Sequence, residues 1–235
     1  MPTATEPFTG FRPEAIQFLA DLAENNDRAW FTPRKADFER LLKKPLESLC
    51  EALDERFRAR DLPLMADPAR SPFRIYRDVR FSKDKSPYKT NISASFPWSG
   101  GDDPGDPHAE RTGTDPSGYF HLAPGEVYVG GGMWHPAVAK LAAFRRAVAD
   151  DPARVRRIID EPRFVATFGR LSGETLKRTP TGFSPDHPEA ELLKLKDVTF
   201  GHRLSDDDVM APDLPDTIAD SFEVAVPVMR WLASL

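Results

Sequence analysis

The residues best suited to chemistry in this chain form a cationic segment at positions 73–91, FRIYRDVRFSKDKSPYKTN. It carries six cations against two acids, a local charge of +4, whereas the whole chain has a formal net charge of −5. Positive charge concentrated within an acidic chain indicates a site for an anion. The candidate ligand-binding residues of this segment are Arg74, Tyr76, Arg77, Arg80, Lys83, Lys85 and Lys89. In the alternative, Asp78 and Asp84 pair with Arg77 and Lys85, and the segment is a structural ion-pair network.

A second candidate group lies on a predicted β-hairpin whose turn is centred on the Pro-Gly pair at 124–125. This turn pairs His121 with Tyr128, and alternation places both on one face together with Tyr119 and Glu126. The candidate catalytic residues are His121, Tyr128 and Glu126, with His121 as general acid or base. A lone histidine on a strand more often has a structural role, so the sequence does not decide whether the protein is an enzyme.

The same alternation extends this polar face over the other predicted strands. It adds Arg74, Tyr76, Asp78, Arg80, Asn91, Ser93 and Ser95. An ordinary solvated face of an antiparallel sheet is the alternative. Arginine, tyrosine and histidine suit directional contacts, and arginine binds phosphate or carboxylate through two hydrogen bonds. We therefore expect the polar face to carry the site.

A run of three glycines precedes a helix predicted to begin near Pro136. Glycines let the backbone approach a ligand closely, and helix N-termini favour anions, which predicts a phosphate cradle. The candidate ligand-binding residues here are Gly130, Gly131, Gly132 and Trp134. No Gly-Lys-Ser/Thr follows, so this is no Walker motif. A bulge or a tight exit from a strand is the alternative interpretation.

Hydrophobic periodicity predicts the elements that position these residues. Helices are expected at 13–24, from Thr32-Pro33 to about Arg58 with an interruption at Pro45, after 136, from Asp151-Pro152, and at 215–232. Strands are expected at 73–81, 91–96, 119–122, 127–131 and 198–204. This order predicts an α+β fold, with a central antiparallel sheet, helices packed on one face, and N- and C-terminal helices.

We expect one domain over residues 8–235, since no linker divides the chain. Within it, the Gly-, Pro- and Asp-rich segment 97–117 is predicted to be a mobile acidic loop. Its charge of −4 over residues 99–117 allows two interpretations. It is either a lid that screens the cationic segment or an insertion with no partner.

The composition limits the cellular compartment, the cofactors and the partners expected for the protein. Cys50 is the one cysteine, so no intramolecular disulfide can form, and its place among leucines predicts a buried side chain. No signal peptide and no membrane span are recognisable, which predicts a cytoplasmic protein without a membrane partner. The five histidines lack metal-ligand spacing, so we expect neither a metal nor another cofactor. The pI of about 5.6 argues against a dedicated binder of duplex DNA.

Three segments resemble a known family. They are 73–91, 118–136 (GYFHLAPGEVYVGGGMWHP) and 10–31 (GFRPEAIQFLADLAENNDRAWF). Together they are similar to DUF2461, a family of hypothetical proteins catalogued as a domain of unknown function. The resemblance runs from residue 8 to the C-terminus, with 97–117 as an insertion. It implies no activity and no catalytic residue.

The functional hypothesis therefore rests on the candidate residues and not on the family resemblance. We expect the polar sheet face to bind a phosphorylated or otherwise anionic ligand through Arg74, Arg80 and Lys85, beside His121 and Tyr128. One alternative is a module for single-stranded nucleic acid, with bases stacked on tyrosines and Trp134. A non-catalytic protein-interaction domain is the other.

Overall fold

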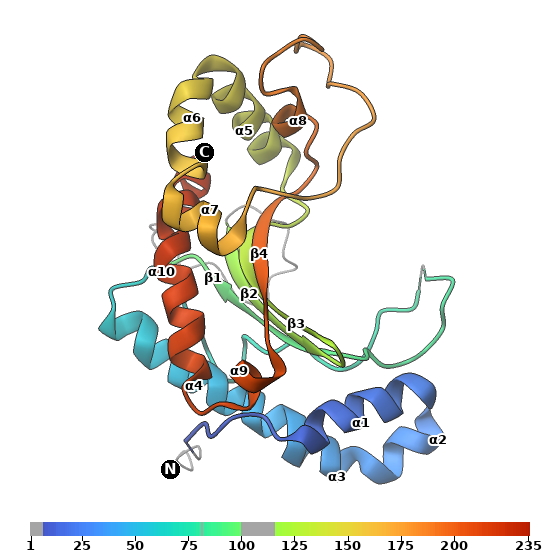
Figure 1. Ribbon diagram of the computed structural model, residues 1–235. Coiled ribbons are helices and arrows are strands. Elements are labelled where there is room, and N and C mark those ends of the chain that lie inside the picture. Colours follow the sequence, from blue (N-terminus) through green and yellow to red (C-terminus); the bar gives the residue numbers. More distant parts are fainter. Residues whose placement is uncertain (1–6, 81, 100–115) are drawn as a thin grey trace.

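A four-stranded antiparallel sheet lies at the centre of the protein (Figure 1). The computed structural model describes residues 7–80, 82–99 and 116–235. The strands neighbour one another in chain order. They are β1 (Ile92–Pro97), β2 (Ser117–Ala123), β3 (Glu126–Met133) and β4 (Val198–Leu204).

Helices precede, interrupt and follow the sheet. The N-terminal set is α1 (Pro13–Glu24), α2 (Arg28–Phe31), η1 (Thr32–Arg34), α3 (Lys35–Phe38), η2 (Glu39–Lys43) and α4 (Lys44–Ala59). Between β3 and β4 lie α5 (Val138–Asp150), α6 (Pro152–Ile159), α7 (Pro162–Phe168) and α8 (Ala190–Leu193). The chain ends with α9 (Asp206–Met210) and α10 (Leu214–Ala233). The predicted α+β class with terminal helices is confirmed.

The helices α1, α4, α7 and α10 pack against one face of the sheet. Phe120, Val129 and Phe200 on that face are fully buried, as the alternation requires. At the centre of this layer, Phe222 of α10 meets Phe57 of α4 and Phe96 of β1, each pair edge-to-face. Apolar burial on one side thus leaves the polar side chains on the other.

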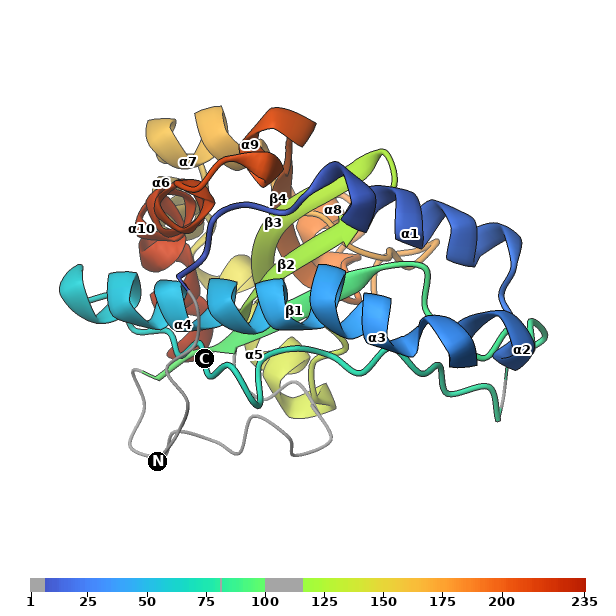
Figure 2. The ribbon, with the colours of Figure 1, turned by 90° about the horizontal axis from the view of Figure 1, so that it is seen from below.

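The helical segments from α2 to α4 form one nearly continuous rod (Figure 2). It begins at Arg28 rather than at the predicted Thr32, because the Asp27 side chain accepts a hydrogen bond from the Trp30 amide at 2.8 Å. Near Pro45 the rod contains the π turn η2. Proline has no amide hydrogen to donate to the carbonyl four residues earlier, so the helix widens there.

The predicted hairpin is confirmed in its register. His121 lies opposite Tyr128, and Leu122 opposite Val127, with the turn at the Pro-Gly pair. The apolar pair is buried, while the other two side chains are half-buried on the opposite face. The predicted strand at 198–204 is confirmed as β4.

The strand predicted at 73–81 is wrong. The chain pairs with β1 only briefly, where the Phe73 amide donates to Ser93 at 2.8 Å. It then leaves the sheet and projects away from it (Figure 1), pairing with 87–89 through the Arg77 amide and Pro87 carbonyl at 2.9 Å. A regular strand would turn Arg77 toward the apolar core, and burying an unpaired cation is costly.

Both ends of the segment 97–117, predicted as an acidic loop, belong to the sheet. Pro97 ends β1 and Ser117 begins β2, and between them the Trp98 amide donates to the Pro116 carbonyl at 3.2 Å. Trp98 is buried. Residues 100–115, and with them the lid and insertion interpretations, lie outside the described residues.

Cys50 is buried in α4 as predicted, and burial raises the pKa of its thiol far above the usual range. Within the described ranges, no helix combines the length and the apolar character that a membrane crossing requires.

Candidate functional site

The polar face of the sheet gathers side chains from all four strands. Ser93 lies opposite His121, His121 opposite Tyr128, and Tyr128 opposite Arg203. Tyr119 stands two residues from His121 on the same strand and therefore on the same face. Ser93 is buried, whereas Tyr119, His121 and Tyr128 are half-buried.

Tyr119 and His121 form a coupled pair on this face. The Tyr119 hydroxyl lies 3.1 Å from His121 Nδ1. Burial lowers the pKa of His121, which favours a neutral imidazole whose Nδ1 accepts from the hydroxyl. Burial also raises the pKa of Tyr119, and a hydrogen bond with Ser93 opposes that rise. Both rings therefore stay uncharged near neutral pH.

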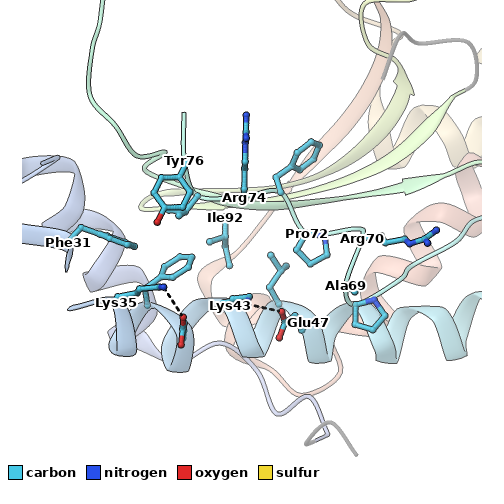
Figure 3. A pocket seen from close by; sticks show the side chains of 16 residues that line it. Phe31, Lys35, Lys43, Glu47, Ala69, Arg70, Pro72, Arg74, Tyr76 and Ile92 are labelled. Carbon is cyan, nitrogen blue, oxygen red and sulfur yellow. Dashed lines mark ion pairs between the residues drawn. The ribbon is translucent and has the colours of Figure 1, made fainter. Parts of the chain in front are cut away.

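Two cations stand beside this pair at the sheet edge. The Phe73 ring meets the Tyr119 ring edge-to-face at 6.3 Å, and Lys89 Nζ lies 5.0 Å from the centre of the Phe73 ring. Arg74 points away from the helix that carries Lys43 and Glu47 (Figure 3), toward the polar side of the sheet. Burial lowers the pKa of Lys89, and the charge of Arg74 lowers it further.

We call this group the cationic corner; its members are Phe73, Arg74, Lys89, Ser93, Tyr119 and His121. Within residues 7–80, 82–99 and 116–235, neither Arg74 nor Lys89 has an ion-pair partner. The charge of Arg74 lowers the pKa of Lys89, and it also lowers that of Asp78. An anion bound beside Lys89 would offset the cost of its charged form.

The other predicted cations of the segment are already engaged. Arg80 pairs with Asp78 at 2.7 Å and holds the pKa of that carboxyl at about 2. Arg77 pairs with Asp84, whose pKa is held well below its usual range. Lys85 Nζ donates to the Val79 carbonyl at 2.9 Å. The ion-pair alternative is thus correct for Arg77 and Asp84, whereas Asp78 takes Arg80 as its partner.

Two further members of that segment do not join the corner. Lys83 is exposed on the part of the chain that projects from the sheet. Tyr76 is 51% exposed and packs against Tyr88 at 5.5 Å between ring centres. The prediction that the polar sheet face includes Tyr76, Asp78 and Arg80 is wrong, because the chain leaves the sheet after Phe73.

Tyr128 is held by the backbone of β4. Its hydroxyl donates to the Phe200 carbonyl at 3.1 Å, and its ring covers Gly201 so closely that an added Cβ would lie 2.0 Å from the hydroxyl oxygen. Glu126 is exposed at the turn, 3.9 Å from Arg203. These contacts account for Tyr128 and Glu126 by their structural roles. The catalytic roles of the two residues stay predictions.

The glycine run lies inside β3 rather than in a loop. Gly130, Gly131 and Gly132 pair with β2 on one side and β4 on the other, so the sheet ladder uses this backbone. An added Cβ on Gly130 would lie 2.2 Å from the Phe200 carbonyl oxygen. Close approach of β4 accounts for the glycines, and the phosphate-cradle interpretation receives no support from this position.

Trp134 follows β3 and is 60% exposed. Tyr119 of the cationic corner lies opposite Gly130, four positions before Trp134, a distance of about 13 Å along the strand. Its ring lies 4.5 Å from that of His135, whose amide donates to Asp197 at 2.7 Å. Trp134 therefore does not join the cationic corner.

Phe73 is the corner residue that the sequence misplaced. The predicted polar face contained Arg74 and Tyr76, which places Phe73 on the apolar face, but Phe73 is 37% exposed and faces Tyr119. No signal in the sequence marks the point at which the chain leaves β1. In the part of the chain that the structure describes, no group of three His, Cys, Asp or Glu side chains is placed to hold a metal ion.

Comparison with models of protein families identifies the family of the chain. The model of a conserved hypothetical protein family, DUF2461, matches residues 14–231. The chain belongs to the DUF2461 family. No curated protein and no solved structure matches it. Membership of DUF2461 assigns no activity to the chain. The function is therefore inferred from the geometry of the site.

The ionisation of His121 gives a first test of this geometry. We expect His121 to titrate below the usual histidine pKa of 6.5, and Glu126→Gln to lower its pKa further, because the Glu126 charge raises it. The unfolded state then binds more protons than the folded state, so His121 makes stability fall as the pH drops below 6.5. NMR titration of the imidazole measures the pKa, with Glu191→Gln as a remote control. A higher His121 pKa in Glu126→Gln would contradict the arrangement.

Proposed function

We propose that the protein binds a phosphorylated or otherwise anionic ligand at the cationic corner of the polar sheet face. The single observation that carries the proposal is that two cations, Arg74 and Lys89, lie near each other, and within the described residues neither forms an ion pair. Burial and the charge of Arg74 both lower the pKa of Lys89, while nearby acids neutralise Arg77 and Arg80. The ligand site is thus narrower than the sequence predicted, and Arg80, Lys85 and Tyr128 are left out of it.

The neighbours of the two cations suit such a ligand. Arginine offers two parallel donors to a phosphate or carboxylate, and the lysine ammonium adds a point charge. Ser93, Tyr119 and His121 supply hydroxyl and imidazole groups on the adjacent strands. These groups hold and orient an anion, and we propose binding without assigning a reaction.

The nucleic-acid alternative has weaker support from the geometry. Tyr88, one of its stacking platforms, is buried against Phe31 with 4.1 Å between ring centres. Tyr128 lies over Gly201, and Trp134 does not join the cationic corner. Bases stack on exposed aromatic rings that follow one another along a basic groove. Among the described residues around Arg74 and Lys89, Phe73 and Tyr76 are exposed, whereas Tyr119 is half-buried and bonded to His121.

The test compares phosphate with chloride at matched ionic strength. Phosphate at about 100 times its dissociation constant should stabilise the wild type by about 2.7 kcal/mol, seen as a raised melting temperature. The Arg74→Ala/Lys89→Ala double variant should lose this response, because it removes both unneutralised charges. Isothermal titration calorimetry with phosphate measures the affinity directly.

Arg80→Ala is the matched control, since it removes an arginine of the same segment that Asp78 already neutralises. It should keep most of the phosphate response. An equal response in the wild type and the double variant, or a loss confined to Arg80→Ala, would overturn the proposal.

A further inference from the structure

A groove of about 770 Å³ lies on the other side of segment 68–76, between this segment and the rod of α3, η2 and α4 (Figure 3). Its floor is apolar and comes from both walls: Phe38 and Leu46 from the rod, Ile75 and Ile92 from the sheet side. A volume of this size is typical of a site for one small molecule, which is roughly 300–1,000 Å³. The walls leave an apolar surface that no segment of the described chain fills.

Charged side chains form the rim of the groove. Two carboxylates stand among four cations, a net charge of +2 in a chain with a net charge of −5. The rim residues are Lys35, Glu39, Lys43, Glu47, Arg70 and Arg74. The first four repeat at a spacing of four, a sequence signal that places them on one face of the rod.

Not all of these cations are available to a ligand in the groove. Lys35 pairs with Glu39 at 3.9 Å, and Lys43 with Glu47 at 3.7 Å. Arg74 points away from the rod (Figure 3). Arg70 is exposed, and within the described ranges its side chain has no ion-pair partner. The groove therefore has one cation at its end whose charge no acid compensates.

Part of the backbone of the upper wall is already paired within the protein. The Phe73 amide donates to Ser93, and the Ser71 carbonyl accepts from the Ser95 amide at 3.1 Å. Farther along, the Ile75 carbonyl accepts from the Lys89 amide at 2.7 Å. These pairings occupy part of the backbone that an added strand would need, and the lining side chains remain to contact a ligand.

The opposite wall contains the π turn η2, a feature that is frequent at functional sites. We propose that the groove binds an amphiphilic carboxylate, with its acyl chain along Phe38, Leu46 and Ile92 and its carboxylate at Arg70. The groove and the cationic corner lie on opposite sides of segment 72–76, and they share two lining residues, Phe73 and Arg74. The apolar floor buries the chain, and the uncompensated arginine selects the acidic head group.

Calorimetric titration with dodecanoate, below its micellar concentration, tests the proposal. The wild type should bind one equivalent. Ala69→Trp places an indole in the groove from an exposed lining position and should abolish binding. Ala139→Trp, an exposed site on α5 away from the groove, is the matched control and should bind as the wild type does.

The head group is tested separately. Arg70→Ala should weaken dodecanoate binding about tenfold, as expected for the loss of one charge-assisted contact, whereas Arg163→Ala on α7 should not. Lys89→Ala should leave dodecanoate binding unchanged, which separates this site from the cationic corner. Equal affinity of the wild type for uncharged dodecyl maltoside, or undiminished binding by Ala69→Trp, would overturn the proposal.

Discussion

Gly132→Ala is expected to lower the free energy of unfolding by about 4 kcal/mol, which combines backbone strain of about 1–3 kcal/mol with overpacking of about 1–3 kcal/mol. Gly132 has φ of +115°, a conformation that side chains rarely adopt. An added Cβ would lie 2.2 Å from the Val198 carbonyl oxygen and 2.9 Å from the Thr199 Cα, so the β3–β4 pairing would have to open. Urea unfolding measures the change.

Gly125→Ala is the matched control for this prediction. Gly125 also has a positive φ, +71°, but an added Cβ meets no atom within 4 Å. Its cost should be backbone strain alone, about 1 kcal/mol. If Gly132→Ala proved no more destabilising than Gly125→Ala, the close approach of β4 would not explain the glycine run, and a ligand role for it would regain support.

Phe222→Ala should destabilise the protein by about 4 kcal/mol, the usual cost of emptying a large buried aromatic site. Phe222 is fully buried and lies 5.8 Å from the ring centres of both Phe57 and Phe96. Its ring also fills the space beside Gly118, where an added Cβ would lie 2.6 Å from it. The truncation removes contacts between α10, α4 and β1 at one point, and thermal and urea unfolding measure the loss.

Two substitutions calibrate this result. Phe222→Leu retains most of the volume and should cost less than half as much as the alanine variant. Val165→Ala changes a residue that is 40% exposed on α7 and should stay within about 0.5 kcal/mol of the wild type. A Phe222→Ala protein with wild-type stability would mean that the helical layer is not held at this aromatic cluster.

The two proposed sites lie on opposite sides of one short segment. Phe73 and Arg74 belong to the cationic corner and also border the groove, while Ile75 lines the groove floor. The segment pairs through its backbone with β1 and with 87–89, and its side chains border both sites. This division explains why one stretch of sequence combines a high charge with several aromatic rings.

Local patterns in the sequence determined the hairpin and most of the helices. The Pro-Gly turn and the two-residue period of the strands were sufficient for the pairing of His121 with Tyr128, because a shift by one residue would bury the polar side chains. The start of α6 could be predicted because Asp151 caps the helix through the Arg154 amide. Such signals act over a few residues, so a single sequence contains them.

Only the tertiary structure decided which cations of the segment are uncompensated. The sequence shows Arg74, Arg80, Lys85 and Lys89 as equivalent charges. Asp78 neutralises Arg80 locally, whereas Lys89 reaches Arg74 because the chain folds back and pairs Ile75 with it through the backbone. Tyr119 joins them from a strand across the sheet. Burial and the distance between charges depend on contacts between segments far apart in the chain, and neither charge counts nor periodicity can supply those contacts.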